Sequence, residues 1–126
     1  MGPTSILAVG LGAAIGAWLR WWLGTTLNAV FPTIPLGTLA ANLIGGYIIG
    51  LAVAFFGQHP GLSPDARLFI ITGCLGGLTT FSTFSAEAVG LFSRGEIAWA
   101  LAHIGLHVAG SLTCTWMGML TVKAVL

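Results

Sequence analysis

The distance between charged residues constrains this chain more than any other feature of its sequence. Only seven of its 126 residues are charged, and they leave uncharged stretches at 1–19, 21–64, 68–86 and 97–122. A helix that spans the hydrocarbon core of a bilayer needs about 20 apolar residues, so each stretch is long enough for at least one span. Soluble domains carry about 25% charged residues, and seven charges cannot cover a water-soluble fold of this size. The sequence therefore predicts an integral membrane protein.

The charge balance excludes further classes of protein. The formal net charge is +1, and the four basic residues form no cluster. Nucleic-acid binding depends on a basic surface that neutralises phosphates, and this chain has none. The composition also excludes a soluble enzyme and a disordered chain. The remaining class is an integral membrane protein that does not bind nucleic acid.

Turn-forming residues divide the longest uncharged stretch. Residues 21–64 are too many for one helix, and Asn28, Pro32 and Pro35 mark a turn within them. The sequence thus predicts an all-α fold with four transmembrane helices in a single domain covering residues 1–126. The expected helices are at about 4–27, 36–57, 66–93 and 97–122.

The positive charges favour neither orientation in the membrane. With the N-terminus inside, Arg67 and Lys123 lie inside, whereas Arg20 and Arg94 lie outside. Orientation normally follows the bias of Lys and Arg between loops, and here the count is equal. Dual topology and a single orientation both stay open. Two oppositely oriented copies could form an antiparallel dimer, the intermolecular counterpart of an inverted repeat.

The third predicted helix contains a segment that disfavours helix formation. Gly76 and Gly77 are followed by a Ser/Thr-rich run that ends at Ser85, and the middle of the span falls near residue 80. Lipid cannot satisfy backbone groups freed by a break, so these groups must face protein, an ion or water. The segment indicates either a kink that aids packing or a broken helix that marks an ion site.

Several uncharged polar and aromatic residues could line a path for an anion. Phe81 and Phe84 lie three residues apart, and the edges of aromatic rings carry partial positive charge. Asn42 lies in the middle of the second helix and offers amide N–H donors. On the fourth helix one polar stripe comprises His103, His107, Ser111 and Thr115. The same residues could instead form interhelical hydrogen bonds. Glu87 lies near the edge of the span, and its role stays open.

Three motifs carry a resemblance to a known family. They are Gly-Gly-Leu-Thr-Thr-Phe-Ser-Thr-Phe-Ser at 76–85, Ala-Asn-Leu-Ile-Gly-Gly at 41–46 and Gly-Ala-Trp-Leu-Arg at 16–20. With these motifs the chain resembles the CrcB/Fluc family of fluoride channels over essentially its whole length.

The resemblance implies a dual-topology antiparallel homodimer with two fluoride pores. It also implies a structural Na⁺ on the two-fold axis, held by the backbone carbonyls of Gly76 and Thr79. Arg20 matches an arginine that lines an aqueous vestibule. The pore residues implied by motif position, or by the polar stripe, are Asn42, Phe81, Ser82, Thr83, Phe84, His107, Ser111 and Thr115.

The function implied is a fluoride-selective channel in a bacterial plasma (inner) membrane, which lowers cytoplasmic fluoride by passive electrogenic export. The alternative is a proton-coupled exporter of the small multidrug-resistance type, which also has four helices and dual topology. Such an exporter needs a carboxylate in its first helix. Residues 4–27 contain neither Asp nor Glu, which argues against this alternative.

Overall fold

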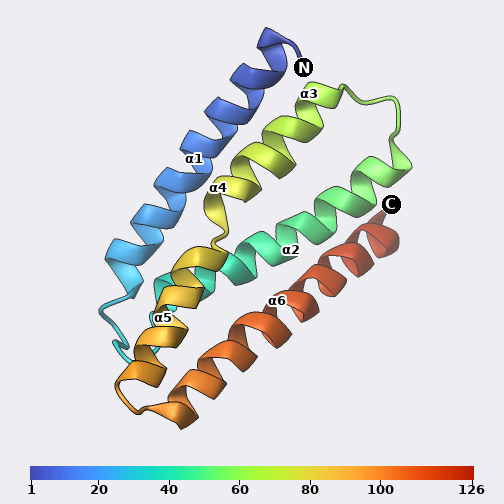
Figure 1. Cartoon of the computed structure of the whole chain (residues 1–126). Coiled ribbons are helices and arrows are strands. Elements are labelled where there is room, and N and C mark those ends of the chain that lie inside the picture. Colours follow the sequence, from blue (N-terminus) through green and yellow to red (C-terminus); the bar gives the residue numbers. More distant parts are fainter.

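The computed structural model describes residues 1–126 and contains helices and loops only (Figure 1). Four helical segments are long and apolar enough to span a membrane, as predicted, and the third of them is broken. Their bounds differ from the expected ones by no more than three residues. The elements are α1 (Pro3–Leu27), α2 (Leu36–Gln58), α3 (Pro64–Arg67), η1 (Leu68–Leu75), α4 (Gly76–Leu78), α5 (Phe81–Ser93) and α6 (Ile97–Val125).

The third span is continuous as far as Leu78 and then breaks. Its first half passes from α3 through the π-helical η1 into α4. Thr79 (φ −84°, ψ 153°) and Thr80 (φ −149°, ψ 116°) are extended, and α5 begins at the next residue. The break predicted in this span is confirmed. It lies at Thr79–Thr80, however, and Gly76 and Gly77 themselves are helical.

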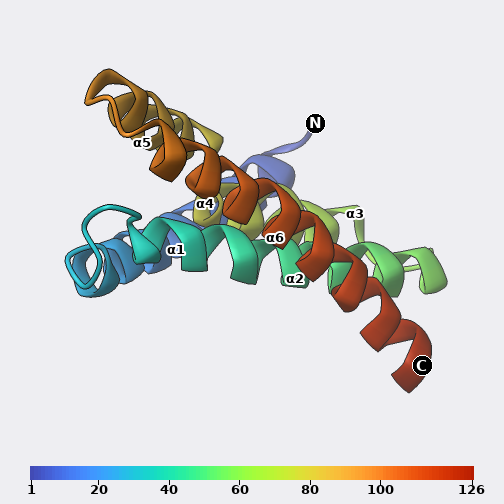
Figure 2. The ribbon, with the colours of Figure 1, turned by 90° about the horizontal axis from the view of Figure 1, so that it is seen from below.

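The helices associate as two pairs. In Figure 1, α1 runs beside η1 and α4, whereas α2 runs beside α6. After the break, α5 packs against α6, and Figure 2 shows it lying near the N-terminal half of that helix. The break therefore transfers the third span from one helix pair to the other.

Glycines bring α1 into backbone contact with the third span. A Cβ atom on Gly16 would collide with the carbonyl oxygen of Cys74, and one on Gly77 would collide with that of Ala13. Small residues allow such close approach in lipid, where no hydrophobic force drives helices together. Gly77 thus serves packing, which explains why a residue of low helix propensity occurs within a helix.

The α2–α6 pair uses the same device. A Cβ atom on Gly50 would meet the carbonyl oxygen of Thr115, and one on Gly118 would meet that of Tyr47. Both glycines are buried. The two helix pairs are therefore built on close backbone contacts, and the larger side chains are left to cover the outer faces.

The turn between α1 and α2 is closed by one side chain. Asn28 Oδ1 accepts hydrogen bonds from the backbone N–H groups of Gly37 (2.7 Å) and Thr38 (3.1 Å). These N–H groups belong to the first turn of α2 and have no partner within the helix. Asn28 therefore satisfies them and fixes the start of α2, on which Thr38 and Asn42 lie.

Gly16→Ala is expected to destabilise the fold, whereas Gly10→Ala on the same helix is not. A methyl group on Gly16 meets backbone atoms that cannot move aside, but nothing lies within 4 Å of a Cβ atom on Gly10. Overpacking of this kind costs about 1–3 kcal/mol. Thermal unfolding of the purified protein in one detergent measures the difference. Equal Tm values for the two variants would contradict the close contact.

Candidate functional site

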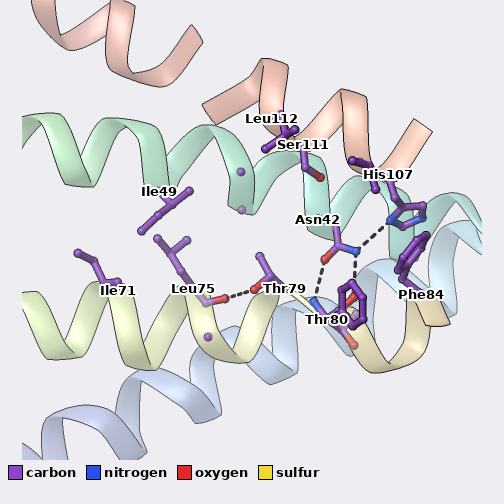
Figure 3. A pocket seen from close by; sticks show the side chains of 15 residues that line it. Asn42, Ile49, Ile71, Leu75, Thr79, Thr80, Phe84, His107, Ser111 and Leu112 are labelled. Atoms are coloured by element: carbon purple, nitrogen blue, oxygen red, sulfur yellow. Dashed lines mark hydrogen bonds between the residues drawn. The ribbon is translucent and has the colours of Figure 1, made fainter. Parts of the chain in front are cut away.

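The break in the third span is satisfied by the side chain of Asn42. In a continuous helix the Thr80 N–H would donate to the carbonyl of Gly76. Here it donates to Asn42 Oδ1 (2.7 Å), and the Thr80 carbonyl accepts from Asn42 Nδ2 (3.0 Å). Figure 3 shows the pair of bonds. The amide of Asn42 thus replaces a peptide group, and it ties α2 to the break.

Two further side chains complete the hydrogen bonding at the break. Thr80 Oγ1 accepts from the N–H of Thr83 (3.1 Å) and caps the start of α5. Arg20 Nε donates to the carbonyl of Gly77 (3.0 Å). The resemblance implied that Arg20 lines a vestibule, and this role stays a prediction. In the structure Arg20 binds a carbonyl at the end of α4.

The carbonyls of Gly76 and Thr79 lose their helical donors at the break. The Thr80 N–H, which lies four residues after Gly76, is bound to Asn42. The Thr83 N–H, which lies four residues after Thr79, is bound to Thr80 Oγ1. Because both donors are directed elsewhere, these two carbonyl oxygens can accept a different partner. They are the two carbonyls predicted for a cation.

A cavity of about 460 Å³ opens beside the break (Figure 3). Its polar lining comes from three of the four spans, and the rest is apolar. Among the predicted site residues, the ones that line it are Asn42, Gly76, Thr79, Phe81, Phe84, His107 and Ser111. The sequence therefore predicted a set of residues that the fold brings to one cavity.

Aromatic rings form one wall of this cavity. The buried ring of Phe84 lies 4.7 Å from that of His107 and 5.3 Å from that of His103, measured between centroids. Phe81 is 5.5 Å from Phe84 in an edge-to-face arrangement and is 76% exposed. The buried Phe84 is thus held between α5 and α6, whereas Phe81 projects from the protomer.

Glu87 belongs to a small polar cluster next to the Phe84 ring. Its Oε2 accepts from the hydroxyl of Thr38 (2.7 Å), and its Oε1 lies 3.3 Å from Nε2 of His103. Thr38 was missed in the sequence as a site residue. Its spacing of four from Asn42, which places both on one face of α2, is the signal that could have found it.

Three predicted pore residues do not line this cavity. Ser82 Oγ lies 3.3 Å from Thr80 Oγ1. Thr83 instead lines a second pocket of about 370 Å³, which also contains Arg20 and Thr38. The hydroxyl of Thr115 lies within hydrogen-bond distance of the carbonyls of Gly46 (2.9 Å) and Ser111 (3.0 Å), and so links α6 to α2.

Comparison with known proteins places the chain in a family. Residues 7–119 match the family described as CrcB-like protein, Camphor Resistance (CrcB), and the chain belongs to that family. Three curated relatives bear the name "Fluoride-specific ion channel FluC". The protein from Pseudomonas putida (strain W619) is 66% identical over 93% of this chain and 92% of its own length. Those from Nitrosospira multiformis and Cupriavidus metallidurans are 61% identical (98% and 96% covered) and 54% identical (99% of each).

Asn42→Leu is expected to leave the Thr80 peptide group unpaired and so to loosen the break. The substitution keeps the number and branching of the side-chain heavy atoms and removes both hydrogen bonds to Thr80, and each unsatisfied buried group costs about 1–3 kcal/mol. Amide hydrogen exchange at Thr80 should become faster. Ser111→Ala is the matched control, because Ser111 lines the same cavity without a side-chain bond to Thr80. Unchanged exchange in Asn42→Leu would contradict the bracing role.

Proposed function

We propose that this chain is a fluoride-specific ion channel that lowers cytoplasmic fluoride by passive, electrogenic export. The observation that carries the proposal is the cavity at the break, lined by neutral donors and aromatic rings from three spans. The relatives match this chain over nearly their full length, and their names specify the same ion. The assignment is to a channel and not to an enzyme.

The chemistry of the cavity suits a small anion. Fluoride holds its water tightly, so a selective pore must replace that water with donors at close range. Hydroxyl groups, N–H groups and ring edges supply such donors without a full positive charge. Conduction requires binding strong enough for entry and weak enough for exit, and neutral donors meet both conditions.

The proposed functional unit is an antiparallel homodimer of dual topology. Each protomer leaves apolar lining residues of the cavity uncovered: Phe81 is 76% exposed, Leu112 68% and Val108 47%. An oppositely oriented second copy would cover this face, and two-fold symmetry would give two equivalent pores. The equal distribution of positive charges between the two sides is compatible with both orientations.

A structural Na⁺ fits the freed backbone groups. The carbonyls of Gly76 and Thr79 lack helical donors, and two protomers would supply four such oxygens. Carbonyl oxygens replace the hydration shell of a monovalent cation. When bound, Na⁺ would supply the positive charge that four converging carbonyl dipoles favour. We therefore propose a structural role for this ion.

The location proposed is a bacterial plasma (inner) membrane, in which the chain is a multi-pass protein with four spans. The relatives all come from bacteria. The alternative, a proton-coupled exporter of the small multidrug-resistance type, has no support in α1, which contains no carboxylate.

Fluoride efflux from liposomes tests the function. Vesicles containing the purified protein are loaded with potassium fluoride, and external fluoride is followed with an electrode. Efflux should be fast only after a potassium ionophore is added, because an electrogenic channel needs a counter-current. Vesicles loaded with chloride should retain it. Efflux without the ionophore, or none from folded protein, would contradict the proposal.

Phe81→Ile and Phe84→Ile should each reduce fluoride efflux while the dimer persists. Both changes keep an apolar side chain but remove the ring whose edge attracts an anion. Chemical crosslinking on the same preparations reports the dimer. Wild-type efflux in both variants would exclude the two rings from the pore.

Replacement of Na⁺ should weaken the dimer or its activity. With N-methylglucamine on both sides, the four proposed carbonyl ligands lose a cation that fits them. Crosslinking yield and fluoride efflux are compared at equal ionic strength with Na⁺ or with N-methylglucamine in its place, and the potassium needed for the ionophore is kept the same in both. Equal values of both would contradict the proposed site.

A further inference from the structure

A cluster of buried side chains between α5 and α6 has more ligand atoms than hydrogen bonds. His103 is fully buried and His107 is 4% exposed, and Glu87 faces them from α5. Glu87 Oε1, both nitrogens of His103 and Nε2 of His107 are buried and have no hydrogen-bond partner in the protein. Such buried polar groups are rare, and a carboxylate within a span is costly unless it is paired. The cluster therefore calls for a partner that its members do not supply to one another.

The spacing of the three side chains fits a single metal ion. One ligand atom from each residue lies within 4.8 Å of those of the other two. Glu87 Oε1 and His103 Nε2 are 3.3 Å apart, with no hydrogen bond between them. Tetrahedral Zn²⁺ binds nitrogen and oxygen at about 2.0–2.2 Å, which places two of its ligands about 3.3–3.5 Å from each other. These two atoms are therefore already at the separation that one Zn²⁺ requires, and only the His107 ring has to move closer.

The chemistry of the ligands also suits Zn²⁺. Two imidazoles and one carboxylate are a frequent set of three protein ligands for this ion, with a fourth position left open. The Thr38 hydroxyl donates to Glu87 Oε2 (2.7 Å), and such an outer bond orients the carboxylate so that Oε1 is left for the metal. Ligation through Nε2 of His107 moves the ring proton to Nδ1, so the contact of Nδ1 with Asn42 opens. The loss of one hydrogen bond is thus set against partners for three buried atoms.

We propose that Glu87, His103 and His107 form a binding site for Zn²⁺, and that the bound ion obstructs the path through the cavity. The site stands on the geometry alone, whereas the obstruction rests on the proposed function. His107 lines the cavity next to the Phe84 ring (Figure 3). Thr38, the partner of Glu87, lines the second pocket. A cation held here touches both spaces, links α5 to α6 and binds an arriving anion too tightly for release.

Cobalt binding tests the site without a transport assay. Co²⁺ replaces Zn²⁺ in tetrahedral sites and absorbs visible light strongly only in that geometry, so its spectrum reports both occupancy and coordination. Purified protein without a histidine tag is titrated with Co²⁺ in a fluoride-free detergent buffer, and Zn²⁺ is then added. We expect a tetrahedral spectrum at one Co²⁺ per protomer, and its loss when Zn²⁺ is added. A weak octahedral spectrum, or none, would overturn the site.

Substitutions within the cluster and away from it locate the ion. Glu87→Gln and His103→Gln each replace one ligand. Zn²⁺ affinity should fall by about a hundredfold or more, because loss of even an outer partner of a ligand costs about 10–100-fold. His59→Gln and Glu96→Gln are the matched controls, since His59 lies at the end of α2 and Glu96 at the start of α6. Wild-type affinity in both cluster variants would overturn the site. Should one of them not fold, the other and the wild-type spectrum decide.

Efflux measurements test the obstruction. Vesicles are prepared with Zn²⁺ on both sides, at a concentration that fills the site in the titration. Ionophore-dependent fluoride efflux should be lost with wild-type protein and with His59→Gln, and excess EDTA on both sides should prevent the loss. Undiminished efflux at that concentration would overturn the obstruction. Failure of the proposed function differs from this outcome, because wild-type protein would then show no ionophore-dependent efflux even without Zn²⁺.

Discussion

The pairing of the Asn42 side chain with the Thr80 peptide group is the interaction on which the site depends. A break in the middle of a span exposes backbone groups where lipid offers no hydrogen bonds. The amide of Asn42 satisfies both groups of Thr80, and the cap by Thr80 Oγ1 starts the next helix. These bonds stabilise the break, and the break has two effects on the site. It redirects donors away from two carbonyls, and it carries Phe84 across to the α6 histidines.

Much of the fold could be predicted from where charges and turns fall. The four spans and the break in the third follow from the spacing of charged residues and from the run after Gly77. The location of the break within that run could not be predicted, because it depends on tertiary contacts. Gly77 is helical since α1 packs against it, and Thr79–Thr80 is extended since Asn42 bonds to it.

The sequence singled out residues that the fold brings to one cavity, and their roles in a pore stay predictions. Asn42, Phe84 and His107 reach one cavity, as their positions on three spans suggested. The sequence assigned the amide of Asn42 to the ion, and in the protomer both of its N–H groups bond to protein. Which partners the two N–H groups have depends on the fold and cannot be derived from the sequence. Thr38 was missed although its spacing of four from Asn42 places both on one face of α2, because the sequence does not show that its hydroxyl reaches Glu87.

The break meets a structural requirement and a chemical one. In lipid the backbone groups freed by the break must find hydrogen-bond partners. In this chain the partners are a neutral amide, hydroxyl groups and the Arg20 guanidinium. The same chemistry presents neutral donors beside a buried aromatic ring, which suits a small anion in a pore that must also release it. A second copy, oriented oppositely, would cover the open face of the cavity and complete the path.

Current across a planar bilayer tests the central claim most directly. With fluoride on one side, chloride on the other and the purified protein inserted, the reversal potential reports which anion carries the current. We predict a reversal potential far from zero, with the sign set by the fluoride gradient. A reversal potential near zero would mean that both anions pass equally. That result would contradict a fluoride-selective pore built at the break.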